Sequence, residues 1–427
     1  DGFFESMSAF TTTGSSVFTE SNAQGYWIIN STLAEGSPAH HLELWIRHFA
    51  ESSTLLHISG SADKSYMGLL FWRSFAQWLG GMGIIVLFLA LIAGMGARGT
   101  QLFKAEAPGG PIINKISPRI RETAQKLWLT YIIISIACCL MLLIFGMNLF
   151  DALCHTFTTM ATGGFSTKNA SIGFYSSPYI QWTIIIFMFI GGTNFSLHYL
   201  AYKARNPLVY TKSPEFRLYA GIALSASFLV ALGLYWGGDI GKWGEQIRLA
   251  SFQVVSIMTG TGYATADYNL WPSTATGVLF LMMFVGGCIG STTGNIKVGR
   301  YLILIRRVLI EFNKMVHPKA VITMRYGGRI INEDLVSNVA QFFFLYFMFL
   351  ALGVVGLTLL GLDVTSSLTA SAACLGNIGP GFAAVGPTQN YAFIPDAGKY
   401  LLSALMLIGR LEIFPMLVLL VPAYWKQ

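Results

Sequence analysis

The turn Thr12-Thr13-Gly14-Ser15 has three counterparts along the chain, each centred on glycine and separated from the next by long apolar segments. The counterparts are Thr162-Gly163-Gly164-Phe165, Gly260-Thr261-Gly262-Tyr263 and Asn377-Ile378-Gly379-Pro380. A cation that crosses hydrocarbon must exchange its hydration water for other oxygens, and stacked backbone carbonyls supply them where glycine permits unusual dihedral angles. Four such turns around one axis would form a ring of carbonyls, so we interpret them as an ion selectivity filter.

The turns belong to an internal repeat. Asp1 precedes Gly14 by the same 13 positions that separate Asp151 from Gly164, and Ser or Thr recurs through both intervals. Any one of these glycines could instead serve close packing between membrane helices. Packing glycines, however, have no reason to follow a short segment and precede a full span four times, so the repeat favours the filter.

The composition places the chain in a membrane. It has 427 residues, of which 54% are hydrophobic and 11% charged, far below the roughly 25% charged residues of soluble domains. A span needs about 20 apolar residues. Seven segments meet this length, near residues 69–95, 127–147, 178–200, 215–236, 273–296, 336–361 and 394–422.

The charges predict the orientation. If the glycine turns are reached from outside, residues 97–126, 201–217 and 297–335 lie in the cytoplasm. These segments and Lys426 contain 19 of the 27 Lys and Arg residues, whereas 7 lie outside and Arg410 lies in a span. Cytoplasmic loops of membrane proteins carry this excess of positive charge. The net charge of +7 therefore reflects membrane topology and not nucleic-acid binding.

Each repeat is predicted to consist of a span, a short re-entrant pore helix, a glycine turn and a second span. The expected fold is an all-α integral membrane protein with four such pseudo-repeats around a central ion pore, as in potassium channels. Acids or hydroxyls lie near the starts of several pore helices, where they interact favourably with the helix dipole: Asp1, Asp151, Asp363 and Thr365. The C-terminal ends of these helices carry partial negative charge and would face the pore. The expected repeats are residues 1–100, 101–205, 206–320 and 321–427. The first lacks its leading span, so we expect the chain to be N-terminally truncated.

A glycine-rich stretch, Gly286-Gly287-Cys288-Ile289-Gly290-Ser291-Thr292-Thr293-Gly294-Asn295-Ile296-Lys297, interrupts the predicted span of the third repeat. It lacks the G-x-x-x-x-G-K-[ST] pattern of a phosphate loop. A closely packed helix is one alternative, but four glycines within nine residues cost such a helix about 1 kcal/mol each. We favour a non-helical break that lines a water-filled cavity beneath the filter and acts as a gate, with Gly286, Gly287, Gly290, Gly294 and Lys297 as its residues.

Arg410 lies within the last apolar segment, in Gly409-Arg410-Leu411-Glu412. An arginine at mid-membrane costs roughly 2.5 to 3.5 kcal/mol, so it generally faces an aqueous path or a partner. One alternative is a structural pair with Glu412, although residues two apart on a helix do not face each other. We expect Arg410 to project into the pore below the filter, where its charge would raise the barrier to cations.

The remaining polar features do not indicate catalysis. Residues 19–68 form a polar insert with His40, His41, His48 and His57, which lack the spacing of a metal site. We expect this insert to be an extracellular loop. The five cysteines (Cys138, Cys139, Cys154, Cys288 and Cys374) have no metal-ligand spacing and are expected to be small core residues. The sequence therefore indicates neither an enzyme nor a bound cofactor.

Taken together, the four glycine turns, Gly80-Gly81-Met82-Gly83, residues 286–297 and Gly409-Arg410-Leu411-Glu412 resemble the Trk/Ktr/HKT superfamily of potassium transporters, and within it the bacterial TrkH subunits most closely. The resemblance extends over the whole chain except residues 19–68. It implies that Gly14, Gly164, Gly262 and Gly379 mark potassium selectivity. It also implies that K⁺ is coordinated by carbonyls of Thr12, Thr13, Thr162, Gly163, Gly260, Thr261, Asn377 and Ile378.

The same resemblance implies a homodimer with one pore per subunit in a prokaryotic inner membrane. It further implies that the loop at 286–297 and Arg410 control the pore, together with a cytosolic nucleotide-binding subunit of the TrkA type. Potassium uptake through a channel-like pore is the leading interpretation. A sodium-coupled potassium symporter of the Ktr type is the second, and a structural scaffold subunit is the third, which the four intact filter glycines disfavour.

Overall fold

The computed structural model describes residues 1–17, 67–94, 120–237, 242–319, 322–326, 329–331 and 333–419. The four histidines of the polar insert, and nearly all of that insert, lie outside these residues, as do residues 97–119 of the first predicted cytoplasmic segment. The described chain is helical except for turns, loops and one short pair of strands.

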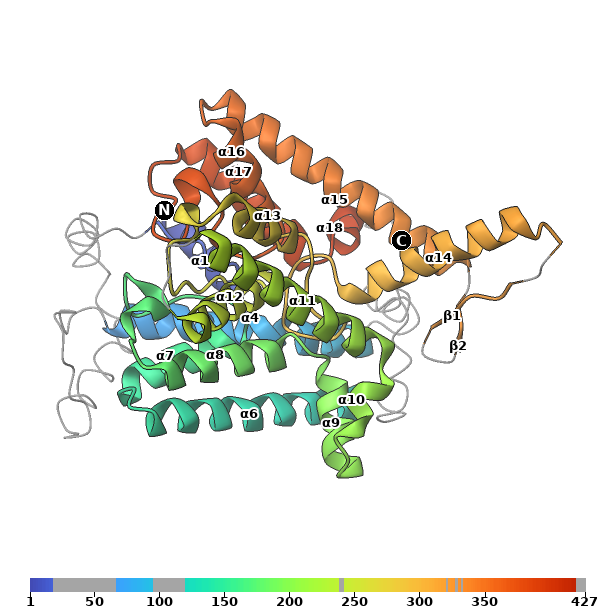
Figure 1. Ribbon diagram of the computed structural model, residues 1–427, viewed down its shortest axis with the longest axis horizontal. Helices are drawn as coiled ribbons and strands as arrows, with labels where there is room; N and C mark the ends of the chain where they lie inside the picture. The colour runs from blue at the N-terminus through green and yellow to red at the C-terminus, as the bar shows by residue number, and fades with distance from the viewer. Residues whose placement is uncertain are drawn as a thin grey trace.

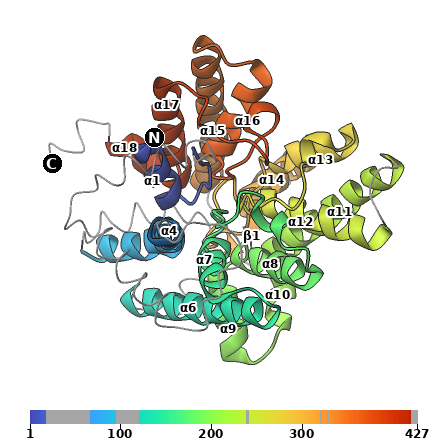
Figure 2. The same ribbon diagram turned by 90° about the vertical axis from the view of Figure 1, so that its left-hand side faces the viewer.

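The described helices form four groups that follow one another along the chain and surround a common centre (Figure 2). Each group contains one short helix before a glycine turn: α1 (Gly2–Phe10), α7 (Leu149–Met160), α12 (Trp243–Met258) and α16 (Val364–Leu375). A longer helix leads into three of them: α6 (Ile120–Ile144), α11 (Pro214–Gly237) and α15 (Glu333–Leu359). A further helix follows each glycine turn: α4 (Met67–Gly94), α8 (Pro178–Gly191), α13 (Ser273–Met282) and α17 (Asp396–Arg410). The predicted arrangement of pseudo-repeats is therefore present, whereas the boundaries proposed at residues 100, 205 and 320 stay a prediction.

The long helices carry the surface of a membrane protein. Within the described residues, α6, α11 and α15 are long and apolar enough to cross a membrane. On α6, Leu129, Ile133, Ile136, Leu140 and Ile144 are all exposed, and their spacing of three or four residues puts them on one face of the helix. A soluble monomer rarely exposes so continuous an apolar face, so we interpret this face as the one in contact with lipid.

Three of the seven predicted spans are not continuous helices. The segment predicted at 178–200 bends by 96° between α8 and α9 (Phe195–Ala204). The bend is stabilised by the Asn194 side chain, which accepts a hydrogen bond from the Ser196 amide at 2.8 Å and so caps the new helix. The segment predicted at 394–422 ends its first helix at Arg410, and the positive φ angles of Glu412 and Ile413 separate α17 from α18 (Phe414–Leu419).

The third interruption is the one that the glycine content predicted. Helix α13 ends at Met282, and the backbone is not helical again until α14 (Val298–Val316). Within this stretch, the amide of Gly286 donates to the carbonyl of Ile296 at 2.9 Å, and the amide of Val298 donates to the carbonyl of Gly287 at 3.0 Å. The two ends of the loop are therefore held beside each other, and the loop between them forms a compact unit.

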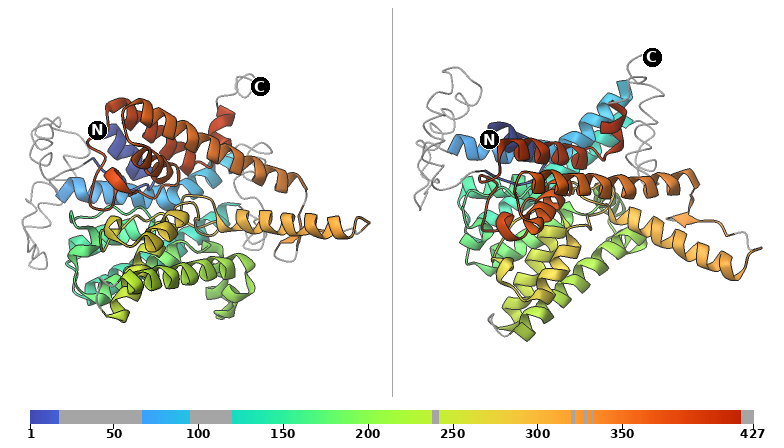
Figure 3. Two further views of the ribbon diagram at one scale, coloured as in Figure 1. Left: turned by 45° about the horizontal axis from the view of Figure 1, so that its top comes forward. Right: turned by 90° about the horizontal axis from the view of Figure 1, so that it is seen from above.

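Helix α14 projects beyond the helical bundle (Figures 1 and 3). It is followed by the two-residue strands β1 (Arg325–Tyr326) and β2 (Arg329–Ile330), which pair antiparallel with Arg325 opposite Ile330. The remaining described elements are short connections: α10 (Leu208–Lys212), η3 (Ser171–Phe174), η4 (Tyr268–Leu270) and η5 (Ala383–Val385). All five cysteines are free, and only Cys139 is not fully buried, as expected of small core residues.

Candidate ion-binding site

The four glycine turns share one set of backbone hydrogen bonds. At the end of α1, the amides of Thr11, Thr12 and Thr13 donate to the carbonyls of residues 7, 9 and 8, at distances of 2.9 to 3.1 Å. The same three bonds, in the same order, recur in the turns that begin at Ala161, Thr259 and Gly376. The turns are thus equivalent residue by residue, although their sequences differ.

The turns also share the sign of φ at two positions. The central glycines Gly14, Gly164, Gly262 and Gly379 have φ of +80°, +74°, +76° and +98°. The residues two positions earlier also have positive φ: Thr12 at 54°, Thr162 at 53°, Gly260 at 68° and Asn377 at 53°. Positive φ is uncommon for residues other than glycine and tends to mark functional sites. Each turn therefore carries a backbone conformation that glycine at its centre makes possible.

The four turns contact one another in a closed ring. A methyl group placed on Gly14 would meet the carbonyl oxygen of Gly163, and one on Gly164 would meet that of Thr261. One on Gly262 would meet the carbonyl of Ile378, and one on Gly379 would lie 2.7 Å from that of Thr13. The contacts run from turn one to two, two to three, three to four and back to one. Neighbours along the chain are thus neighbours around the ring.

The ring brings backbone carbonyls and helix ends together. Gly14, Gly164 and Gly262 are partly exposed, whereas Gly379 and the residues just before all four glycines are buried. The short helices end where the turns begin, and the C-terminal end of a helix carries partial negative charge. All twelve residues predicted for the filter lie in this ring. Rings of backbone carbonyls replace the hydration shell of a permeating ion, and that is the chemistry available here.

The outer ends of the short helices carry acids, as predicted. The side chain of Asp363 accepts a hydrogen bond from the Ser366 amide at 2.9 Å and caps α16. Asp1 forms an ion pair with Lys399 of α17 at 2.5 Å. In the second repeat, Asn148 is the capping residue, and Asp151 lies in the first turn of α7.

Asp151 connects α7 to the chain that leaves the second turn. Its carboxylate accepts hydrogen bonds from Thr167 at 2.6 Å and Tyr175 at 2.8 Å, and Lys168 lies at 3.3 Å. Burial would raise the pKa of Asp151, but the Thr167 hydrogen bond, the His155 ring, the Tyr175 hydroxyl and the Lys168 charge together hold it below the ordinary carboxyl value. The carboxylate is therefore ionised and fixes the outer side of this turn.

The loop between α13 and α14 lies against the inner ends of the turns. The Thr292 hydroxyl donates to the carbonyls of Met160 and Gly191 at 3.0 and 3.2 Å, which ties the loop to the second repeat. On the other side, a methyl group on Gly294 would lie 2.8 Å from the Cβ atom of Asn377, so the loop also packs against the fourth repeat. The predicted gate residues are thus placed directly beneath the candidate filter.

Arg410 links the loop to the first repeat. Its guanidinium donates to the carbonyl of Thr292 in the loop at 2.7 Å, and to the carbonyls of Gly80 and Gly81 in α4 at 2.9 and 3.1 Å. It does not pair with Glu412, which instead forms an ion pair with Arg300 of α14. The alternative of an Arg410–Glu412 pair was therefore wrong, because the break after α17 turns Glu412 towards another helix. Through Arg410 and the loop, all four repeats meet below the ring.

Lys297 lies beside this closure. Its ammonium donates to the carbonyl of Thr293 and to the Thr293 hydroxyl. Lys297, Arg410 and Glu412 line one small cavity of about 10 Å³, which is roughly the space of one water molecule. Two cationic side chains and one carboxylate thus lie below the ring of turns.

The loop is also tied to the start of α11. Glu215, in the first turn of α11, accepts a hydrogen bond from the Ile289 amide of the loop at 2.6 Å. Tyr326 in β1 is close enough to the same carboxylate to interact with it electrostatically. A buried glutamate therefore connects the loop beneath the ring to the strands beyond α14.

Sequence reasoning missed three buried polar residues near the ring: Glu5, Arg73 and Gln77. Gln77 donates to the carbonyl of Gly163 at 2.7 Å, so one of the predicted filter carbonyls has a side-chain partner. Arg73 and Gln77 are four residues apart in an otherwise apolar helix, which puts them on one face. That spacing was the available signal, whereas nothing in the sequence indicated which turn they contact.

Comparison with known proteins gives concordant matches. The family described as "TrkH: Cation transport protein" matches residues 1–229 and 240–427. The Trk system potassium uptake protein TrkH of Salmonella typhimurium is 40% identical over 384 residues, which cover 89% of this chain and 79% of that protein. The Trk system potassium uptake protein TrkG of Escherichia coli is 34% identical over 375 residues, covering 88% and 76%. The crystal structure of the potassium transporter TrkH from Vibrio parahaemolyticus superimposes with a TM-score of 0.79 at 34% identity, covering 100% of this chain and 79% of that one.

Proposed function

The chain belongs to the TrkH family of cation transport proteins, and we propose that it takes up potassium through a channel-like pore. As a member of this family it is a membrane transport protein and not an enzyme. The observation that carries the proposal is the closed ring in which each filter glycine faces a carbonyl of the next turn. The names of its relatives, which are potassium uptake proteins, support potassium as the ion.

Selection would take place at the ring. The carbonyls of the residues before each glycine (Thr12, Thr13, Thr162, Gly163, Gly260, Thr261, Asn377 and Ile378) replace the hydration water of K⁺, and the four helix ends add partial negative charge. The membrane potential drives entry, because one charge that crosses 100 mV gains about 2.3 kcal/mol. No cofactor takes part in this step.

The loop and Arg410 would form the gate. In the arrangement described here, the loop contacts the second and fourth repeats, and Arg410 joins it to α4 of the first. Opening then requires the bond between Arg410 and Thr292 to break and the loop to leave the inner mouth of the ring. The charges of Arg410 and Lys297 raise the barrier to a cation until this happens.

The remaining parts of the proposal concern assembly and location. We place the protein in the cytoplasmic membrane of a prokaryote, as a homodimer with one pore per subunit. A cytosolic nucleotide-binding subunit of the TrkA type would dock on the basic inner surface, to which α14 contributes Arg306, Arg307 and Lys314. The description of the relatives as parts of a "Trk system" supports a multi-component assembly.

Uptake of rubidium and sodium into liposomes that hold the full-length protein tests the proposal. An inside-negative potential is imposed without any other cation gradient, and rubidium stands in for potassium. Strong rubidium uptake with little sodium uptake is expected. Rubidium uptake that requires added sodium would instead indicate a sodium-coupled symporter, and the absence of both would contradict a conducting pore.

A further inference from the structure

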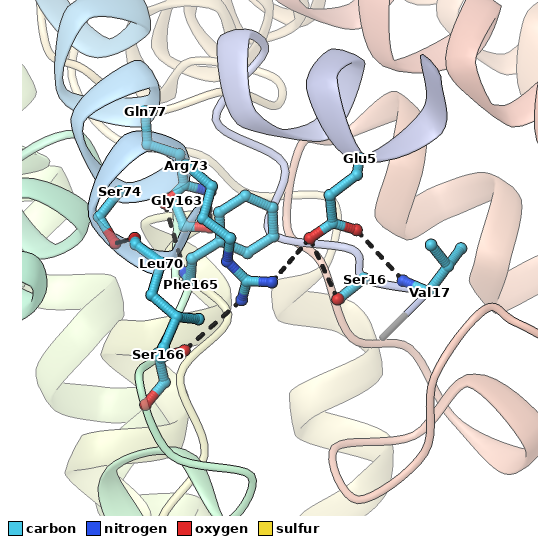
Figure 4. Close-up of polar contacts among 10 residues, drawn as sticks. All are labelled: Glu5, Ser16, Val17, Leu70, Arg73, Ser74, Gln77, Gly163, Phe165 and Ser166. Carbon is cyan, nitrogen blue, oxygen red and sulfur yellow. Dashed lines mark hydrogen bonds and ion pairs between the residues drawn. The ribbon is translucent and has the colours of Figure 1, made fainter. Parts of the chain in front are cut away.

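Helix α4 presents a row of residues to the first two filter turns (Figure 4). Arg73, Gln77 and the pair Gly80–Gly81 are spaced by three or four residues and so share one face of the helix. A methyl group on Gly81 would lie 2.8 Å from the Cα atom of Ala161, at the end of α7. The helix thus lies directly behind the second turn.

Gln77 bonds both sides of Gly164. Its amide nitrogen donates to the carbonyl of Gly163 at 2.7 Å, and its amide oxygen accepts from the amide of Phe165 at 3.3 Å. The Gln77 side chain is completely buried. A methyl group on Gly163 would lie 2.5 Å from the amide carbon of Gln77, so Gln77 occupies the space that a side chain at position 163 would need.

Arg73 extends this contact to the first turn. Its guanidinium forms an ion pair with Glu5 at 2.8 Å, lies 4.0 Å above the ring of Phe165 and donates to the carbonyl of Ser166 at 3.5 Å. Glu5 in turn accepts hydrogen bonds from the Ser16 hydroxyl at 3.2 Å and the Val17 amide at 3.3 Å. The chains that leave turns one and two are therefore joined through one buried ion pair.

The second turn differs from the others in a way that this contact offsets. At the position before the central glycine, the other turns carry Thr13, Thr261 and Ile378, whereas the second carries Gly163. The hydroxyls of Thr13 and Thr261 bond threonines of their own turns at 2.8 and 2.7 Å. Two consecutive glycines have the greatest backbone freedom, so the second turn needs support from outside itself.

We propose that Glu5, Arg73 and Gln77, the filter clamp, are positioning residues that determine ion selectivity by holding the second turn at a fixed place in the ring. The inference rests on the proposed function, because it assigns these residues a part in selecting potassium over sodium. A ring of fixed oxygens discriminates by the distance and number of its carbonyls. If the second turn moves, the ring can adapt to the smaller sodium ion, and discrimination falls.

The test measures rubidium and sodium uptake by full-length variants in the liposome assay described above. Gln77→Met keeps the length of the side chain and removes both hydrogen bonds. Arg73→Lys keeps the charge beside Glu5 but loses the planar fork that reaches Ser166. Ser74→Ala is the matched control, since the Ser74 hydroxyl donates to the carbonyl of Leu70 in its own helix at 2.8 Å.

For Gln77→Met, we expect the ratio of rubidium to sodium uptake to fall about tenfold, which corresponds to about 1.4 kcal/mol. Arg73→Lys is expected to lower the ratio in the same direction, and Ser74→Ala to leave it unchanged. The double variant Glu5→Leu/Arg73→Leu separates selectivity from folding, because apolar replacement of a whole buried pair is often tolerated. It should keep the thermal stability of the wild type and lose selectivity.

A wild-type ratio of rubidium to sodium uptake in folded Gln77→Met would overturn the clamp. If Gln77→Met does not fold, a wild-type ratio in folded Glu5→Leu/Arg73→Leu would overturn it. An equal fall of the ratio in Ser74→Ala and Gln77→Met would also overturn it. In that case any substitution in α4 would lower selectivity. The failure of the proposed function looks different. In that case the wild type itself takes up no rubidium, whereas failure of the clamp leaves wild type and variants equally selective.

Discussion

Replacing Arg410 by alanine is expected to raise cation flux, because this side chain joins the loop beneath the ring to the wall of the pore. Its guanidinium makes one bond to the loop, at the carbonyl of Thr292, and two to α4, at Gly80 and Gly81. Only 9% of the residue is exposed, so water does not readily replace these bonds.

The size of the effect follows from the single bond to the loop. When the loop leaves, the bonds of Arg410 to α4 can remain, and the bond to Thr292 is lost. A hydrogen bond to a charged group contributes about 1.5 to 3 kcal/mol, and 1.4 kcal/mol is about tenfold in an equilibrium constant. If the wild type is mostly closed, Arg410→Ala should increase rubidium flux by roughly 10- to 100-fold.

Arg410→Lys distinguishes the bond from the charge. A lysine keeps the positive charge but cannot bridge Thr292 and the two α4 carbonyls with a planar fork. High flux in both variants would indicate the bond, and high flux in Arg410→Ala alone would indicate the charge. Arg248→Ala is the control, because Arg248 forms a pair with the half-exposed Glu245 at 3.5 Å. Unchanged or lower flux in folded Arg410→Ala would refute the reasoning.

Three further predictions concern the filter, the loop and a helix cap. Gly262→Ser should lower the rubidium-to-sodium ratio by roughly tenfold, because its side chain would meet the carbonyl of the next turn; an unchanged ratio would argue against the filter. Glu215→Ala should raise basal rubidium flux, since the Ile289 amide would lose its acceptor at a cost of about 1 to 3 kcal/mol. Glu215→Gln should raise the flux less. Equal fluxes in Glu215→Ala and wild type would show that this anchor does not hold the loop. Asp363→Ala should lower the unfolding free energy by about 1 kcal/mol at pH 7, measured by thermal unfolding in detergent. Hydrogen bonds from the side chain and amide of Ser366 hold the pKa of Asp363 below its ordinary value, so the stabilisation by the cap is present at neutral pH and is lost as the pH falls below about 3.9. Asp363→Asn should not show this loss. Equal stability of Asp363→Ala and wild type at pH 7 would contradict the cap.

The sequence predicted the parts of the fold that depend on local properties of the chain. Long apolar segments were enough to predict a membrane protein, and the four glycine turns with the short segments before them were enough to predict four pseudo-repeats. The glycines from Gly286 to Gly294 were enough to predict that the backbone is not helical there, because each destabilises a helix wherever it occurs. The four filter turns were identified because glycine permits unusual dihedral angles, which is also a local property. Their role in ion binding stays a proposal.

The breaks at 192–194 and 411–413 were not predicted. Their surroundings are as apolar as a continuous span, and apolar length alone does not distinguish a straight helix from two bent ones. The capping bond of Asn194 and the positive φ angles of Glu412 and Ile413 became visible only in the structure. For this reason the sequence also did not indicate that Glu412 pairs with Arg300.

The sequence by itself determined that the chain has the long apolar segments of a membrane protein, where glycine permits the backbone to turn and which connecting segments are basic. Only the tertiary structure decided the order of the turns around the ring, the three carbonyls that Arg410 bonds and the contact of Gln77 with Gly163. Hydrophobic length and glycine content act within one segment. These contacts join residues 86 to 366 positions apart, and no periodicity in the chain specifies which distant groups meet when the four repeats pack around one axis.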